Sequence, residues 1–174
     1  DGYLRRRWRD PYPDAELAAL AAFAARCRKL GVRFGVGLSP YELFLGFDAA
    51  GKADLASKLA QLDGLGLDDL GIFFDDMKGD LPELAARQVE IIHWIAGRTS
   101  ASRLIACPSY YTDDPVLDRV FGHRPTNYLE DLGRAQSEAQ QIKLAALGRL
   151  TASIAHEVRN PLSAINQAAQ LLEE

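Results

Sequence analysis

The stretch DLGIFFDDM, residues 69–77, has the pattern of a buried strand with an acidic end. Its apolar run is short, follows a glycine and is interrupted directly by Asp75 and Asp76. A short apolar run bounded in this way favours a strand over a helix. We therefore expect a buried β-strand that carries two adjacent carboxyl groups at its carboxyl end.

Helix-like and strand-like segments alternate on both sides of this strand. Asp14 is placed to cap a helix at 14–31, and Pro82 stands in the first turn of a helix at 81–100. The other segments are a strand at 32–40, a helix at 52–66 and a strand at 102–111. Helices that alternate with strands through short connections are typical of right-handed parallel β/α units. The sequence therefore predicts an α/β fold with about three parallel strands.

The two acids at the strand end are the first candidates for chemistry. In parallel β/α folds the active site is built by loops at the carboxyl ends of the strands, where Asp75 and Asp76 stand. Adjacent carboxylates in a partly desolvated pocket repel, which leaves one as a proton donor and the other as an anion. That division suits glycoside cleavage. Two other interpretations stay open: the acids only end the strand and cap the next segment, or they bind a metal, although no His or Glu nearby supplies a third ligand.

Composition and charge argue against several classes of protein. The chain has 174 residues, 48% of them hydrophobic, and a formal net charge of −4. Its one basic run, RRRWR at 5–9, is followed at once by acids, so we expect no nucleic-acid partner. No window is long and apolar enough for a membrane span. Cys27 and Cys107 are too few for a disulfide scaffold or a metal site and suit a reducing compartment, so we expect a cytoplasmic protein without a metal.

Five short motifs point to a known family. They are WRDPYP (8–13), FGVGLSP (34–40), KLAQLDGLG (58–66), FFDDM (73–77) and CPSYY (107–111). In this order they resemble the catalytic domain of family-84 glycoside hydrolases, the hyaluronidase-like β-N-acetylglucosaminidases that include O-GlcNAcase. The resemblance covers residues 1–134.

The resemblance implies a (β/α)8 barrel and a retaining, substrate-assisted reaction on an N-acetylglucosamine-containing glycoside, without a cofactor. In that mechanism the sugar's own acetamido oxygen attacks the anomeric carbon. Carried over by position, Asp75 would orient and polarise the acetamido N–H, and Asp76 would be the general acid and then the base. Tyr111 would contact the sugar, with ordinary packing at a strand end as its alternative role.

The predicted barrel is partial. A barrel of this type needs roughly 250 residues and eight strands, whereas residues 1–134 offer three strand candidates. The chain also begins at Asp1 without an initiator Met, which we interpret as loss of upstream sequence. We therefore expect a fragment of such an enzyme, with weak or no hydrolysis by this chain alone.

Residues 135–174 show a different pattern, with no strand candidate. Apolar or small residues recur there at alternating intervals of three and four, which predicts one long helix with a heptad seam. The seam is Leu144, Leu147, Thr151, Ile154, Val158, Pro161, Ile165, Ala168 and Leu172. His156 falls nearly opposite this seam, toward solvent. From position alone it is either a solvated surface histidine or a nucleophile that another protein can reach.

The residues around His156 resemble the phosphoacceptor helix in the dimerisation hairpin of sensor histidine kinases. The match to the motif H-E-x-x-N-P-L is His156, Glu157, Asn160, Pro161 and Leu162. The resemblance implies that His156 accepts the phosphoryl group of ATP and passes it to a response regulator. Glu157 would assist the transfer and Asn160 would support dephosphorylation of the partner. It also implies a homodimer and a separate ATP-binding domain.

The two resemblances meet in NYLEDLGRAQSEAQQIK, residues 127–143. The first half fits the end of the glycosidase-like part, 1–134, and the second half fits the lead into the kinase-like part, 135–174. We hypothesise that the chain is a chimera of two families joined near Arg134, with a kinase whose upstream region is an input or a passenger as the alternative.

Overall fold

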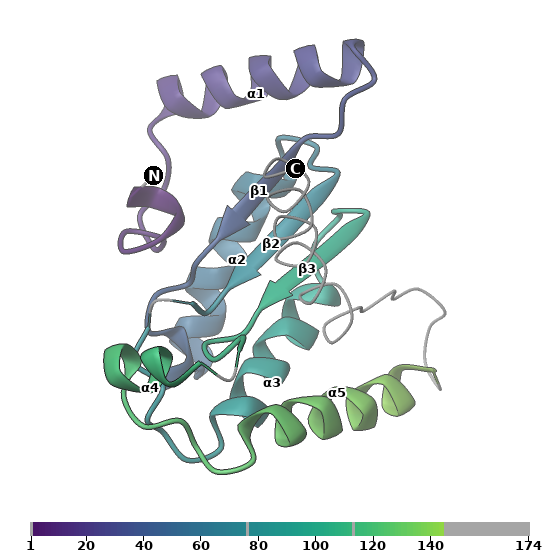
Figure 1. Ribbon diagram of the computed structural model, residues 1–174. Coiled ribbons are helices and arrows are strands. Elements are labelled where there is room, and N and C mark those ends of the chain that lie inside the picture. The colour runs from purple at the N-terminus through teal and green to yellow at the C-terminus, as the bar shows by residue number, and fades with distance from the viewer. Residues whose placement is uncertain (1, 76, 113, 145–174) are drawn as a thin grey trace, which may run out of the picture.

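The computed structural model describes residues 2–75, 77–112 and 114–144 (Figure 1). The helices are α1 (Asp14–Lys29), α2 (Ala49–Asp63), α3 (Leu84–Ala96), α4 (Pro115–Phe121) and α5 (Tyr128–Leu144), with short 3-10 turns η1 (Gly2–Leu4) and η2 (Leu43–Leu45). The strands are β1 (Gly35–Leu38), β2 (Asp69–Phe73) and β3 (Arg103–Cys107). Within these ranges no helix has the length and apolar character that crossing a membrane requires.

The three strands form one parallel sheet in the order β1-β2-β3. Gly37 pairs with Gly71, which in turn pairs with Ile105. In Figure 1, α2 and α3 lie together on one side of the sheet. The prediction of an α/β fold with three parallel strands is therefore confirmed, and the described residues form an open part of a β/α architecture.

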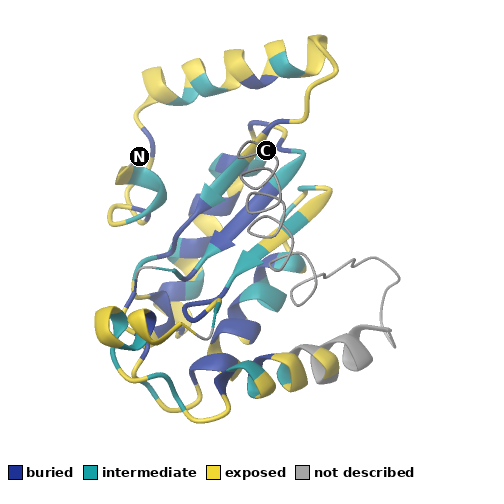
Figure 2. Ribbon diagram, in the orientation of Figure 1, coloured by how far each residue is buried: buried dark blue, intermediate teal, exposed yellow. Residues whose placement is uncertain are grey.

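The core lies between the sheet and the two helices that cover it. Leu38, Leu70 and Ile72 are fully buried, together with Leu55 of α2 and Ile91 of α3. Burial of these side chains is the main driving force for the fold. Figure 2 shows the buried residues concentrated on β2, α2 and α3, while α1 is mostly exposed.

The other face of the sheet is lined by small residues and one large ring. A Cβ atom added to Gly37 would lie 2.3 Å from the Phe73 ring, and one added to Gly71 would lie 2.6 Å from it. Because the two glycines have no side chains, the Phe73 ring can lie over them on this face of the sheet. Ile105, the residue paired with Gly71, remains 44% exposed there.

Two predicted helix starts were wrong in detail. Asp14 is the first residue of α1 rather than its cap, because the carbonyl of Pro13 already accepts the first helical hydrogen bond, from Leu17. Pro82 lies before α3, since Glu83 has a left-handed backbone (φ 59°) that a helix cannot include.

Helix α5 crosses the predicted boundary at 134–135. It begins at Tyr128, lies alongside α3, and buries Tyr128 and Leu132. Residues 135–144, the first part of the expected helix, therefore belong to a helix that starts seven residues earlier, in the α/β core. The rest of the expected helix lies outside the described residues. The described part of α5 ends at Leu144, and the predicted kinase residues His156, Glu157 and Asn160 lie outside the described residues.

Candidate active site

Asp75 lies two residues beyond the end of β2, at the carboxyl edge of the sheet. Its side chain is half-buried, and its Oδ1 atom is shielded from solvent. The residue thus occupies the predicted position at a strand end. Asp76, the second predicted acid, lies outside the described residues.

The chain is held firmly on the amino-terminal side of the acids, at Phe74. The Phe74 N–H donates to the carbonyl of Cys107 (2.9 Å), and its own carbonyl accepts from the Ser109 hydroxyl (2.7 Å). The Phe74 ring is fully buried and packs edge-on against Phe44. Both backbone groups and the side chain of the residue before Asp75 are therefore fixed.

The chain is held again on the carboxyl-terminal side, at Gly79. Its N–H donates to the carbonyl of Phe121 (3.0 Å), at the end of α4. A Cβ atom at Gly79 would lie 2.7 Å from the ring of Tyr110, so the segment passes directly against that ring. The Tyr110 hydroxyl in turn donates to the carbonyl of Gly122 (2.8 Å). The described residues on both sides of Asp76 are thus each hydrogen-bonded to a neighbouring segment.

The two tyrosines that follow β3 have different surroundings. Tyr110 is fully buried, and burial, together with nearby carboxylates, raises the pKa of its hydroxyl. Tyr111 is 38% exposed, the first large exposed side chain after β3. Tyr111 is therefore partly exposed at the carboxyl edge of the sheet, and Tyr110 has a packing role.

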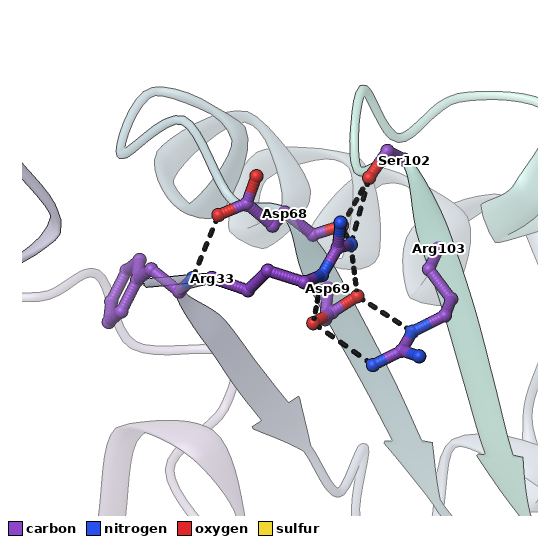
Figure 3. Close-up of polar contacts among 6 residues, drawn as sticks. Arg33, Asp68, Asp69, Ser102 and Arg103 are labelled. Atoms are coloured by element: carbon purple, nitrogen blue, oxygen red, sulfur yellow. Dashed lines mark hydrogen bonds and ion pairs between the residues drawn. The ribbon is translucent and has the colours of Figure 1, made fainter. Parts of the chain in front are cut away.

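The opposite end of the same strand carries a different acid with a different role. Asp69 accepts hydrogen bonds from Arg33 and Arg103 (Figure 3), with Arg103 Nε at 2.8 Å from Oδ1. The Arg33 guanidinium, and after it Arg103, hold the pKa of the Asp69 carboxyl below its usual value. Asp69 is thus neutralised by ion pairs that link the amino ends of the strands, and this edge of the sheet serves stability.

Sequence reasoning missed the polar side chains beneath the acidic loop. Gln88 and Ser109 are fully buried, and Tyr128 is 1% exposed. The one available signal was a glutamine within an otherwise apolar stripe of α3. Within the described ranges, no group of three His, Cys, Asp or Glu side chains is placed to hold a metal ion.

Comparison with known proteins gives a family match over nearly the whole chain. A model of the beta-N-acetylglucosaminidase family matches residues 1–169. A solved mutant of the O-GlcNAc hydrolase from Thermobaculum terrenum is similar with a TM-score of 0.62 and 25% sequence identity, over 78% of this chain. The chain spans 30% of the length of that hydrolase.

A second similarity is short. The sensor protein kinase PilS of Pseudomonas aeruginosa is 66% identical over 47 residues, which are 27% of this chain and 9% of that kinase. Because the family model leaves only residues 170–174 uncovered, the two matches overlap over most of the shorter one. The family match extends over nearly the whole chain, and the similar hydrolase structure agrees with the α/β fold. The chain therefore belongs to the beta-N-acetylglucosaminidase family.

Proposed function

We propose that this chain supplies the acidic part of a β-N-acetylglucosaminidase active site, with an N-acetylglucosamine glycoside as substrate. The observation that carries the proposal is Asp75 at the carboxyl edge of a parallel sheet, next to Phe74, whose backbone N–H and carbonyl are both hydrogen-bonded. The family match supports the same chemistry.

The proposed reaction uses the sugar's own acetamido group. Asp75 accepts a hydrogen bond from the acetamido N–H and so raises the electron density on the carbonyl oxygen, which attacks the anomeric carbon. Asp76 donates its proton to the departing glycosidic oxygen. In the second step Asp76 takes a proton from water, which opens the cyclic intermediate and restores the starting configuration. Tyr111 contacts the sugar from the end of β3.

Sugar binding gives a direct test, because it does not require turnover. Titration of the isotope-labelled chain with N-acetylglucosamine is expected to shift the amide NMR signals near residues 75 and 109–111, and glucose, which lacks the acetamido group, is expected to shift them far less. Asp75→Ala removes a charge-assisted hydrogen bond and should weaken binding about ten-fold or more.

Asp76→Asn is the matched control for this experiment. A general acid acts mainly in the transition state, so its loss should leave ground-state sugar binding nearly unchanged. Equal responses to glucose and N-acetylglucosamine, or an unchanged affinity in Asp75→Ala, would contradict the proposed roles.

A second candidate function rests on the short similarity to a sensor kinase and on the motif that surrounds His156, within residues 135–174. In this proposal His156 accepts a phosphoryl group from ATP held by a separate domain, Glu157 assists, and Asn160 supports dephosphorylation of a response regulator. The helix would work in a homodimer, and a join near Arg134 would connect it to the glycosidase-like part.

Radiolabelled ATP tests this second candidate. Incubation of the chain with a separately produced ATP-binding domain of a histidine kinase is expected to label the chain with acid-labile phosphate, and His156→Gln should lose the label. Arg159→Gln, at a variable position of the motif, is the control that should keep it. Label that persists in His156→Gln would exclude His156 as the acceptor.

A further inference from the structure

Three buried polar side chains form a chain of hydrogen bonds that ends at the residue before Asp75. The Tyr128 hydroxyl donates to Gln88 Oε1, and Gln88 Nε2 donates to Ser109 Oγ at 2.8 Å. The Ser109 hydroxyl donates to the Phe74 carbonyl at 2.7 Å. We call Tyr128, Gln88 and Ser109 the relay.

The relay joins three elements that are far apart in sequence. Tyr128 is the first residue of α5, Gln88 lies in the middle of α3, and Ser109 follows β3. All three are at most 1% exposed. Polar groups in such a place are costly unless each finds a partner, and here each one has a partner.

The end of the relay acts on the acid through the geometry of the peptide bond. The Phe74 carbonyl and the Asp75 N–H belong to one peptide unit, which is planar. A hydrogen bond that fixes the direction of this carbonyl therefore also fixes the plane from which Asp75 departs. The Phe74 N–H belongs to the preceding peptide unit, which its hydrogen bond to the Cys107 carbonyl holds in place. The Phe74–Asp75 unit therefore cannot rotate without breaking its hydrogen bond with Ser109.

We propose that Ser109, Gln88 and Tyr128 are positioning residues, which set the direction of Asp75 by holding the Phe74 carbonyl. The inference rests on the proposed function for the role of Asp75, and it extends that function to residues that lie beneath the site. It also makes the first turn of α5 a part of the site's support.

The sheet itself provides a matched control at its other end. The Ser102 hydroxyl, just before β3, donates to the carbonyl of Asp68, just before β2, at 2.9 Å (Figure 3). Ser102→Ala and Ser109→Ala therefore remove the same kind of bond between the same two chain segments. Only the bond made by Ser109 lies at the carboxyl end of β2, next to Asp75.

The first measurement is amide hydrogen exchange at Asp75, compared with exchange at Leu70 and Ile72 within β2. Ser109→Ala is expected to speed exchange at Asp75 about ten-fold relative to those two amides, because the free peptide unit samples other orientations. Ser102→Ala is expected to leave this ratio unchanged. A purely structural role for Ser109 would change all three amides alike.

The second measurement is affinity for N-acetylglucosamine, which should fall about ten-fold in Ser109→Ala and stay within about two-fold in Ser102→Ala. An unchanged exchange ratio at Asp75 overturns the positioning role whatever the sugar affinity. A changed ratio in a protein that binds no sugar leaves the positioning role standing and removes the proposed function.

Tyr128→Phe provides a second variant if Ser109→Ala does not fold. It keeps the ring in place and removes only the outermost hydroxyl, so the exchange ratio should rise in the same direction but by less. A Tyr128→Phe protein whose Asp75 exchange ratio matches the wild type would show that the relay ends at Gln88 and would overturn the role of Tyr128.

Discussion

Replacing Trp8 by alanine is expected to lower the free energy of unfolding by about 3–5 kcal/mol, the range for removing a large aromatic side chain from a core. Trp8 is fully buried, and its indole N–H donates to the carbonyl of Tyr41 at 3.2 Å. The substitution thus leaves a large cavity and a carbonyl without its donor. Since domains of this kind are stable by only about 5–15 kcal/mol, the loss is a large fraction of the total.

Urea denaturation followed by circular dichroism measures this loss as a lower midpoint. Trp8→Phe separates the two causes, because it keeps most of the apolar volume and removes only the N–H donor, and it should cost clearly less than alanine. Phe23→Ala, an aromatic truncation on α1 at a side chain that is 57% exposed, is the matched control. An equal loss in Phe23→Ala and Trp8→Ala would show that Trp8 does not anchor the amino-terminal segment.

The fold was largely predictable because its signals are local. The apolar run before Asp75 predicted β2, and the glycines and prolines around the other segments predicted their order. Strand lengths were overestimated at 32–40, since β1 ends at Leu38. There the N–H of Ser39 donates to the carbonyl of Leu4 instead of to a neighbouring strand, and Pro40 has no N–H to donate.

The support of the candidate site was not predictable from the sequence, because it depends on contacts between distant residues. Gln88 and Tyr128 are 40 positions apart, and Ser109 and Phe74 are 35 apart. No spacing rule connects them. The motif WRDPYP likewise suggested only a family resemblance, whereas the structure shows that its Trp8 and Tyr12 are core residues.

Helix α4 is a different case, because the sequence contains a local signal for its start. Asp114 accepts a hydrogen bond from the N–H of Val116, and Pro115 occupies the first turn. An acid followed by proline is a common helix start. The helix has only seven residues, which is too short for a clear helical periodicity.

Raising the pH above about 10 is expected to destabilise the fold by about 1.4 kcal/mol per pH unit through Tyr128 alone. Burial raises the pKa of the Tyr128 hydroxyl above its ordinary value of 10.0. The folded chain therefore keeps this proton while the unfolded chain loses it, so the stability is fully present below pH 10 and is lost as the pH rises. Burial also raises the pKa of the Tyr12 hydroxyl, which adds a loss in the same direction.

Unfolding free energies at several pH values, in wild type and Tyr128→Phe, test this expectation. At pH 7 the variant should be less stable by about 1 kcal/mol, because it lacks the hydrogen bond to Gln88. Near pH 12 the order should reverse, since phenylalanine has no proton to keep and wild type has lost about 3 kcal/mol. Two curves that stay parallel from pH 9 to 12 would contradict the assignment.

Lys58 contributes to the pH dependence of the unfolding free energy with the sign opposite to that of Tyr128. The measured pH dependence is therefore the difference between these contributions. Burial lowers the pKa of its ammonium group, which is held by the carbonyl of Asp10 (2.7 Å) and lies 4.6 Å from the centre of the Tyr12 ring. The folded state therefore releases this proton more easily than the unfolded state. The contribution of Lys58 to folding stability thus rises with pH up to the ordinary lysine pKa of 10.5. Lys58→Met should remove that rise and make the alkaline loss begin at lower pH, whereas Tyr128→Phe should delay it. Shifts of the two variants in the same direction would exclude this account of alkaline unfolding.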